Sequence, residues 1–319
     1  AEPDGLATAT TSDTYFASQY ALQNDGQSFT NTAGDIVVAG GTPDADVDAV
    51  EAWPLASGAN IKVAVLDSGV DANHPDLRSK IDARANFSSA ATQDDNYGHG
   101  THVAGIVGAV HNTEGVAGVC PGCRILDGKV LNDSGSGSAS GIANGINWAV
   151  NNGAKVINMS LGMRSSRTLQ TAVTKAWDKG VVLVAAAGNG GNTTKLYPAA
   201  YPNVIAVGAT DNRDAKASFS TYDASWVDVA APGVNVYSTF PSHNFYLMRN
   251  GRSMMYDVGN GTSMSSPIVA AVAALAWSKT PAASNVTVRS TIETTADKSV
   301  AGTGTYWAHG RVNAYNAVK

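Results

Sequence analysis

The sequence has little charge and no long apolar run. Charged residues make up 15% of its 319 positions, and the formal net charge is −5 without long runs of one sign. Such a balance disfavours a nucleic-acid-binding role, which needs a basic surface. The longest apolar run, residues 268–277, is too short to cross a bilayer. We therefore expect a protein that binds neither nucleic acid nor membrane.

Cysteine is also scarce. The only two cysteines form Cys120-Pro121-Gly122-Cys123, and a C-x-x-C pair can be a redox couple, half of a zinc site or a short-loop disulfide. No second pair completes a zinc site, and no thioredoxin-like sequence surrounds the motif. A structural disulfide is favoured over free thiols, and it would agree with an exported protein.

Apolar residues and glycine are abundant. The apolar content is 44% and there are 33 glycines, which suits a sizeable core with many tight turns. We assign residues 1–319 to a single domain, in which residues 1–55 form an arm packed on the rest. The first residues, 1–5, lack Met and any signal-peptide pattern, as expected of a processed chain.

Short runs rich in β-branched residues alternate with helical patterns. The runs cover residues 61–67, 124–131, 155–159, 181–187 and 204–207, and the helical patterns cover 142–151 and 169–179. This alternation predicts an α/β fold with a mostly parallel sheet and helices on both faces. Residues 218–261 are expected to be mainly turns. Ligands bind at the carboxyl ends of such strands, where the sequence has Asp67, Ser160-Leu161-Gly162 and Gly188-Asn189.

A serine lies just before the apolar run of residues 268–277. The segment Gly261-Thr262-Ser263-Met264-Ser265-Ser266-Pro267 leads into residues 268–277, which have no polar face and predict a helix buried all round. Pro267 suits the first turn of that helix. There, Ser263 could attack a carbonyl and stabilise the oxyanion with its own backbone N–H. Taken alone, it is equally consistent with an ordinary N-cap.

A nucleophilic serine needs a base and an acid that orients the base. His99 lies between two glycines at the start of a helical segment, and Asp67 follows a buried strand, where a carboxylate is costly unless it is paired. His102 is one turn further on, which fits a structural role better. Zinc at His99 and His102 is disfavoured because the glutamate of an H-E-x-x-H motif and a third ligand are missing.

Four blocks together resemble the subtilisin-like serine proteases, and the thermitase-like branch most of all. They are Asp67-Ser68-Gly69, the segment from Gly98 to Gly105, the segment from Val184 to Asn189, and the segment from Gly261 to Pro267. Residues 218–222 and 295–315 are also similar to that branch, and the resemblance begins near residue 13.

The resemblance implies a three-layer α/β fold and a secreted serine endopeptidase, expected to be a monomer. In the family mechanism, His99 takes the proton of Ser263, Asp67 orients His99, and the Asn189 amide binds the oxyanion. Protein or peptide substrates are implied, as is an inhibitory pro-domain that binds the chain before maturation.

The resemblance also assigns a substrate groove. Ser160, Leu161 and Gly162 correspond to one wall of the primary specificity pocket, which Gly188 and Leu196 border. The opposing strand is assigned to Ser134, Gly135, Ser136 and Gly137, for which a flexible surface loop or a phosphate-binding loop is the alternative. A leucine at position 196 favours apolar or aromatic residues before the scissile bond.

Two structural cation sites are implied in the same way. The stronger is a calcium site, for which carbonyl and carboxylate oxygens are suitable ligands; it would use Asp13, Asp76, Val110, Asn112, Glu114 and Val116. The alternative for residues 110–116 is a solvated turn. A weaker cation site would use Ala199, Tyr201, Val204 and Asp228. Residues 86–92 lack the carboxylates of a further calcium loop found in the thermitase-like branch.

The sequence departs from the family between Phe240 and Gly261, where it has a longer loop just before the expected nucleophile. This loop is expected to cover or extend the groove. Two other functions are weighed: a subtilase scaffold that binds without catalysis, and a nucleotide-dependent α/β enzyme. The expected catalytic residues disfavour the first, and the missing ribose-binding acid disfavours the second.

Overall fold

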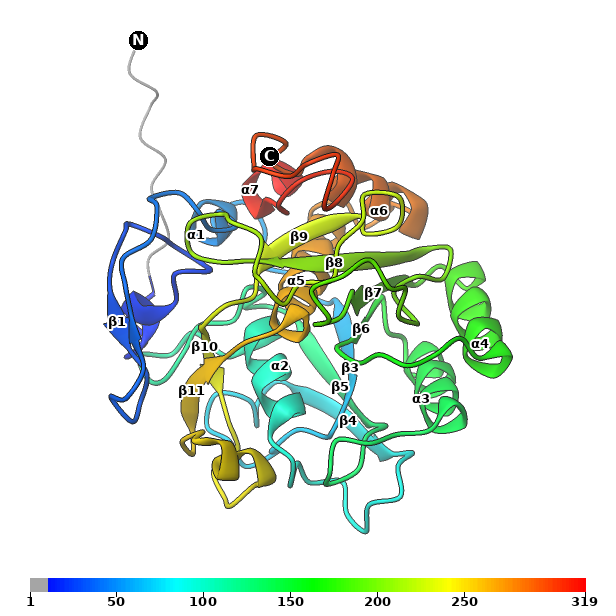
Figure 1. The fold of residues 1–319 in the computed structure, drawn as a ribbon. Helices are drawn as coiled ribbons and strands as arrows, with labels where there is room; N and C mark the ends of the chain where they lie inside the picture. The colour runs from blue at the N-terminus through cyan, green and yellow to red at the C-terminus, as the bar shows by residue number, and fades with distance from the viewer. Residues whose placement is uncertain (1–10) are drawn as a thin grey trace.

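A seven-stranded sheet forms the centre of the computed structural model, which describes residues 11–319 (Figure 1). Its strand order is β4-β5-β3-β6-β7-β8-β9, and every neighbouring pair is parallel. The strands are β3 (Lys62–Asp67), β4 (Ile81–Asn86), β5 (Arg124–Lys129), β6 (Val156–Met159), β7 (Val182–Ala186), β8 (Val204–Thr210) and β9 (Val229–Pro232). The predicted parallel α/β architecture is confirmed.

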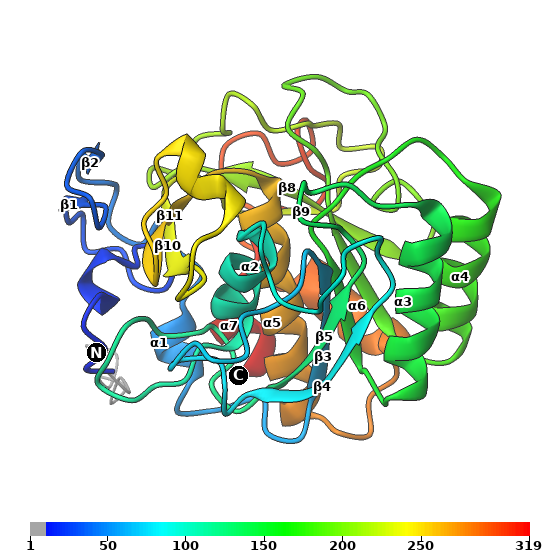
Figure 2. The same ribbon diagram turned by 90° about the horizontal axis from the view of Figure 1, so that it is seen from below.

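Helices cover both faces of this sheet (Figure 2). Alternate residues of a strand point to opposite faces, so Val63 and Val65 of β3 join one core cluster while Ala64 and Leu66 join the other. The first cluster contains α2 (His99–Gly108), α5 (Thr262–Lys279), α6 (Asn285–Thr294) and α7 (Ala314–Val318), and the second contains α3 (Ala139–Asn151) and α4 (Arg167–Asp178).

Helix α5 runs through the first core. Every residue from Met264 to Trp277 is buried, which confirms the helix expected to be buried all round. Its start differs from the prediction, because the helix begins at Thr262 and Pro267 lies inside it instead of in the first turn.

Residues 218–261 are mainly turns and irregular structure, as expected, but they also contain three short strands that were not predicted. Besides β9, strands β10 (Val236–Thr239) and β11 (Tyr256–Gly259) pair in an antiparallel hairpin. Each of the three has only four residues, and Ala, Pro, Ser, Asp and Gly occupy many of their positions. Tertiary pairing therefore decides a conformation for which the local propensity is weak.

The N-terminal arm packs on the hairpin and on the main core. It includes a 3-10 turn, η1 (Phe16–Ser18), a small antiparallel pair, β1 (Phe29–Thr30) and β2 (Val37–Val38), and the short helix α1 (Ala49–Ala52). The ring centroids of Phe29 and Tyr237 of β10 are 6.4 Å apart. Residues 1–10 of the predicted arm lie outside the described residues, and the assignment of the whole chain to one domain stays a prediction.

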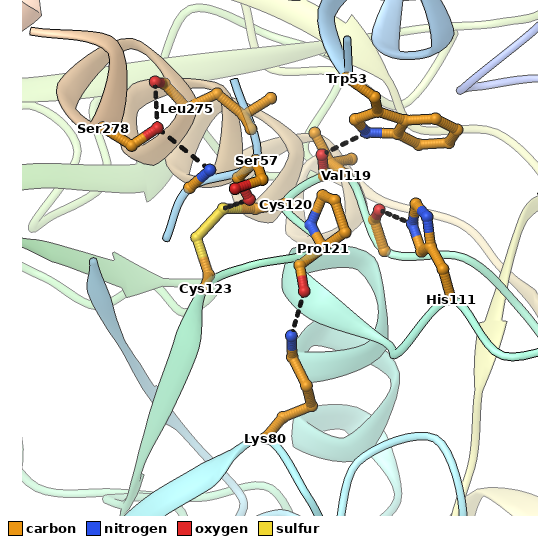
Figure 3. The surroundings of a disulfide bond; sticks show 12 residues. Trp53, Ser57, Lys80, His111, Val119, Cys120, Pro121, Cys123, Leu275 and Ser278 are labelled. Atoms are coloured by element: carbon orange, nitrogen blue, oxygen red, sulfur yellow. Dashed lines mark hydrogen bonds between the residues drawn. A yellow bond between two sulfur atoms is a disulfide. The ribbon is translucent and has the colours of Figure 1, made fainter. Parts of the chain in front are cut away.

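The two cysteines are joined by a disulfide bond, in agreement with the favoured interpretation (Figure 3). Both sulfur-bearing side chains are buried, and the Gly122 N–H donates to the Ser57 carbonyl at 2.6 Å. The residue after Ser57, Gly58, donates its N–H to Ser278 Oγ near the end of α5 at 3.0 Å. The disulfide loop thus secures the start of β3 against α5. Within residues 11–319, no helix combines the length and apolarity that a membrane span requires.

Candidate active site

Asp67 and His99 meet at the carboxyl end of the sheet. Asp67 is the last residue of β3 and is 1% exposed, while His99 opens α2. His99 Nδ1 lies 2.8 Å from Asp67 Oδ1. Burial lowers the pKa of His99, but the charge and hydrogen bond of Asp67 outweigh it, so the net pKa is raised. The pair therefore leaves Nε2 of the ring to act as a base.

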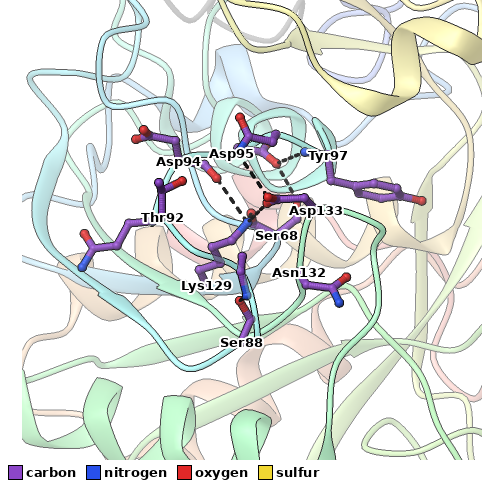
Figure 4. Close-up of polar contacts among 12 residues, drawn as sticks. Ser68, Ser88, Thr92, Asp94, Asp95, Tyr97, Lys129, Asn132 and Asp133 are labelled. Atoms are coloured by element: carbon purple, nitrogen blue, oxygen red, sulfur yellow. Dashed lines mark hydrogen bonds and ion pairs between the residues drawn. The ribbon is translucent and has the colours of Figure 1, made fainter.

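A second carboxylate, Asp95, fixes the backbone on which His99 stands (Figure 4). Asp95 is fully buried, which raises its pKa, and it accepts hydrogen bonds from the N–H groups of Gly98 and Thr101, each at 2.8 Å. Ser68 Oγ donates to it at 2.8 Å and accepts from Gly100 N at 2.9 Å. Asp95 was not predicted, because it lies three positions before the N-cap residue Gly98 and matches no capping pattern in the sequence.

The Ser263 hydroxyl lies at the start of α5 and is partly exposed. It donates to the Ser160 carbonyl at 3.3 Å, and among the described residues it makes no hydrogen bond to His99. Such bonds are often long before substrate binds. Direct contact between Ser263 and His99 therefore stays a prediction.

Pro267 explains an unusual link between α5 and β6. It follows Ser263 by four positions and has no N–H, so the Ser263 carbonyl lacks its normal helical donor. Ser160 Oγ donates to that carbonyl instead, at 2.8 Å. Asn158 Nδ2 donates to Ser160 Oγ at 3.0 Å, and Ser266 Oγ donates to Asn158 Oδ1 at 2.6 Å. A buried polar chain thus joins the expected nucleophile to the end of β6.

Asn189 is oriented by Thr262. The Thr262 N–H and hydroxyl donate to Asn189 Oδ1 at 2.9 and 3.0 Å, and the hydroxyl accepts from Gly188 N at 3.0 Å. Because Oδ1 is engaged, the Nδ2 donor of the amide is left for another acceptor. A Cβ at Gly261 would lie 3.2 Å from this Nδ2, and the φ of 142° there also favours glycine. Thr262 was not predicted to be a functional residue, because only its neighbour Ser263 had an assigned role in the motif.

A groove of about 420 Å³ opens beside His99. It contains both predicted walls, and its lining residues include Gly135, Ser136, Gly137, Ser160, Leu161 and Gly162. Ser134 is exposed and is not among the lining residues; its hydroxyl donates to Asn132 Oδ1 at 2.8 Å within a turn. Tyr97, Leu131, Ile142 and Met163 also line the groove and were not predicted.

Leu196 fills the space between Gly162 and Gly188. A Cβ at Gly162 would lie 3.4 Å from Leu196 Cδ1, and one at Gly188 would lie 2.4 Å from it. Gly188 also has a φ of 113°, which side chains rarely adopt. The leucine therefore lies between Gly162 of the predicted pocket wall and Gly188 of the predicted pocket border, and gives both an apolar partner.

Two buried carboxylates converge at the predicted calcium loop. Asp13 Oδ1 accepts from Asn112 N at 2.9 Å, and Asp76 accepts from Asn112 Nδ2 at 3.3 Å and from Val116 N at 3.0 Å. Tyr15 N also donates to Gly115 O at 2.8 Å, which holds the arm on this loop. Burial, together with the negative charge of Asp13, raises the pKa of Asp76 to about 6, although hydrogen bonds to the carboxylate act in the opposite direction. The remaining predicted ligands, Val110 and Glu114, belong to the same loop.

At the weaker predicted cation site, the side chain of Arg289 supplies a positive charge beside Asp228. Arg289 donates to Asp228 Oδ1 at 3.0 Å and to the Val204 carbonyl at 3.3 Å. It also pairs with Glu293 at 2.6 Å. Ala199 and Tyr201 are buried nearby in the same core cluster as Val204. A guanidinium therefore already neutralises the main acidic ligand predicted for this site.

Comparison with known proteins agrees with this geometry. The subtilase family matches residues 58–310. Thermitase of Thermoactinomyces vulgaris is 50% identical over 276 residues, covering 86% of this chain and 94% of that protein. Subtilisin Savinase of Lederbergia lenta is 47% identical over 264 residues, covering 82% and 92%.

A solved structure shares the fold over nearly the whole chain. It is a protease of Pseudoalteromonas arctica, with a TM-score of 0.83 and 30% identity, and the match covers 97% of this chain and 99% of that one. With a parallel sheet, a buried aspartate–histidine pair and these relatives, the chain belongs to the subtilase family and is a subtilisin-like serine endopeptidase.

Proposed function

We propose that the protein cleaves peptide bonds with Ser263 as nucleophile, His99 as general base and acid, and Asp67 as the group that orients His99. The observation that carries this assignment is the 2.8 Å contact between the buried Asp67 carboxylate and His99 Nδ1. It fixes the imidazole with Nε2 free, as proton transfer from a serine requires.

A residue of this chain can carry out each step of peptide-bond hydrolysis. Ser263 Oγ attacks the peptide carbonyl while its proton passes to His99 Nε2, and Asp67 stabilises the imidazolium. Asn189 Nδ2 and the Ser263 N–H donate to the oxyanion. His99 then protonates the leaving amine, and water hydrolyses the acyl-enzyme by the same route. Because the net pKa of His99 is raised, kcat/KM rises with pH through a value above the ordinary 6.5.

The groove supports an extended peptide substrate with an apolar or aromatic residue before the scissile bond. Leu161 lines the groove, and Leu196 lies against Gly162 of the predicted wall and Gly188 of the predicted border. Burying an apolar side chain against them is favourable, whereas a charged residue would lose hydration without a partner.

Calcium is proposed as a structural ion at Asp13, Asp76 and the loop from Val110 to Val116. Asp13 and Asp76 are 4% and 0% exposed, yet within residues 11–319 neither forms an ion pair with Lys, Arg or His. Two buried carboxylates with this loop's carbonyls fit a hard divalent cation. The ion would stabilise the native state and takes no part in the reaction.

Secretion, a pro-domain partner and a monomeric state complete the proposal. The disulfide Cys120–Cys123 supports an oxidising compartment. The family relationship supports peptide substrates and synthesis with a pro-domain.

The triad assignment is tested with Ser263→Ala and a phosphonate that labels active serines. We expect no turnover by the variant and one covalent adduct on Ser263 of the unaltered protein. Ser265→Ala is the matched control, because this buried serine on the same helix donates only to the Pro232 carbonyl, at 3.2 Å. Turnover retained by Ser263→Ala, with a native melting temperature, contradicts the assignment.

A further inference from the structure

The hairpin extension, residues 240–255 between β10 and β11, is firmly docked on the body. It carries the 3-10 helix η2 (Tyr246–Asn250) and lies beside α2 in both ribbon views (Figures 1 and 2). At its base, Ser242 N and Oγ donate to the buried Asp71 carboxylate at 2.8 and 2.6 Å. Phe240 and Phe245 stack with their ring centroids 5.3 Å apart.

The extension also binds the segment that precedes His99. Tyr246 N donates to the Asn96 carbonyl at 2.8 Å, and Leu247 N donates to the Tyr97 carbonyl at 3.1 Å. Phe245 occupies the space over Gly98, where a Cβ would lie 2.3 Å from its ring. Main-chain bonds and ring packing therefore hold the extension in one position next to the groove.

A stack of three side chains leads outward from the groove. Tyr97 lines the groove together with His99. The Tyr246 ring stacks on Tyr97 at a centroid distance of 5.6 Å and an angle of 27°. The Arg249 guanidinium carbon lies 5.3 Å from the Tyr246 ring centroid, in the geometry of a cation–π contact. Arg249 is thus held near the groove although its side chain is exposed.

Next to this stack lies a hollow of about 470 Å³, lined by Asn96, Asp133, Asn244, Phe245, Tyr246, Met248 and Arg249. The only acid among these lining residues, Asp133, is already compensated. Lys129 Nζ donates to its Oδ1 at 2.9 Å (Figure 4), and Asn96 Nδ2 donates to its Oδ2 at 3.3 Å. By contrast, Arg249 forms no ion pair within residues 11–319. The uncompensated charge of the hollow is positive.

We propose that this hollow is an accessory subsite that takes an acidic side chain of the bound peptide, with Arg249 as the residue that selects it. The proposal rests on the endopeptidase function above, because the peptide must lie in the groove beside Tyr97. An extended chain advances about 3.3–3.6 Å per residue. The side chain of a residue a few positions from the scissile bond can therefore reach past Tyr97 and Tyr246 into the hollow.

The test uses peptides that differ only by Glu, Gln or Lys, scanned through the positions on both sides of one scissile bond. At one position we expect kcat/KM to be about two- to fivefold higher for Glu than for Gln at low salt, the range of an exposed ion pair. The ratio falls towards one in 1 M salt because screening weakens the pair. Arg249→Gln brings the ratio to about one. Arg167→Gln, an exposed arginine at the start of α4, keeps it and controls for net charge.

Two failures are distinguishable. If the peptides are cleaved and the Glu to Gln ratio is the same in the unaltered protein and in Arg249→Gln, the subsite is wrong and the endopeptidase function stands. If none of the peptides is cleaved and Ser263 takes no phosphonate label, the proposed mechanism itself fails. A Glu preference that Arg167→Gln abolishes equally also overturns the subsite, since it reflects only overall charge.

Discussion

Two regions of this molecule bury pairs of carboxylates, and they compensate them differently. Near His99, the Asp67 carboxylate is paired with the His99 imidazole. The Asp95 carboxylate accepts hydrogen bonds from a hydroxyl and from backbone N–H groups at the start of α2. At the arm, Asp13 and Asp76 receive backbone and amide N–H groups but no cationic side chain within residues 11–319. The catalytic region thus compensates its carboxylates with protein groups, including a histidine, and the lack of such a cationic group at the arm supports the proposed calcium site there.

The largest expected effect breaks the first region. Asp67→Asn keeps the shape but removes the charge and favours the wrong imidazole tautomer, so we expect kcat to fall about 10⁴-fold, as in serine proteases of other folds. Steady-state kinetics with a peptide substrate measures it. Asp94→Asn is the control, because that nearby aspartate is largely exposed and pairs only with Arg84, at 3.5 Å. A loss of less than tenfold in Asp67→Asn would refute the role given to this carboxylate.

The second prediction removes the ion from the other region. A ligand present at about 100 times its Kd stabilises the native state by about 2.7 kcal/mol, so chelation of calcium should lower the melting temperature by several degrees. The measurement is calorimetry of the Ser263→Ala variant, which excludes self-digestion. For the unaltered protein, the rate of phosphonate labelling at 25 °C should change little on chelation, because the proposed ion takes no part in the reaction. An unchanged melting temperature would argue against the site.

The third prediction is a smaller, pH-dependent effect in the same region. The folded-state pKa of Asp76 is raised to about 6, so without calcium its stabilising, protonated form is lost as the pH rises from about 4 through 6. In chelator, Asp76→Asn should remove about 1–2 kcal/mol of that decline. Denaturant unfolding at pH 4 and pH 7 measures it, with Asp133→Asn as the control. Parallel pH profiles for the two variants would contradict the prediction.

The smallest expected effect sharpens the comparison within the first region. Ser160→Ala removes the donor to the Ser263 carbonyl, which Pro267 has already deprived of its helical bond. We expect kcat to fall about tenfold, which corresponds to about 1.4 kcal/mol for one buried hydrogen bond. Ser160→Thr should recover part of the loss if the hydroxyl is what matters. Equal activities of the Ala variant and the unaltered protein would show that the link is dispensable.

Local motifs were enough to predict that Asp67 pairs with His99, which the structure shows, whereas the catalytic roles of Ser263 and Asn189 stay predictions. Asp67, His99, Asn189 and Ser263 each lie in a short block with a recognisable function, and the apolar run after Ser263 indicated a buried helix. The parallel sheet was also predictable, because its strands are β-branched runs separated by helical patterns.

The remaining features depend on contacts between distant segments. Asp95 and Thr262 act through hydrogen bonds that are visible only when the chain is folded. Strands β9 to β11 were missed because pairing, and not their own composition, stabilises them. The position of Pro267 inside α5 was wrong in the prediction, because an outside donor, Ser160, supplies the bond that a proline removes.

The contact between Asp13 and the calcium loop has a consequence for the lifetime of the enzyme. An endopeptidase in solution encounters other copies of itself, and an extended terminal segment is the easiest piece to cleave. Asp13 and Tyr15 hold the arm to the loop from Val110 to Val116. We therefore expect the half-life of the protein to follow the release of the arm from this loop and not global unfolding.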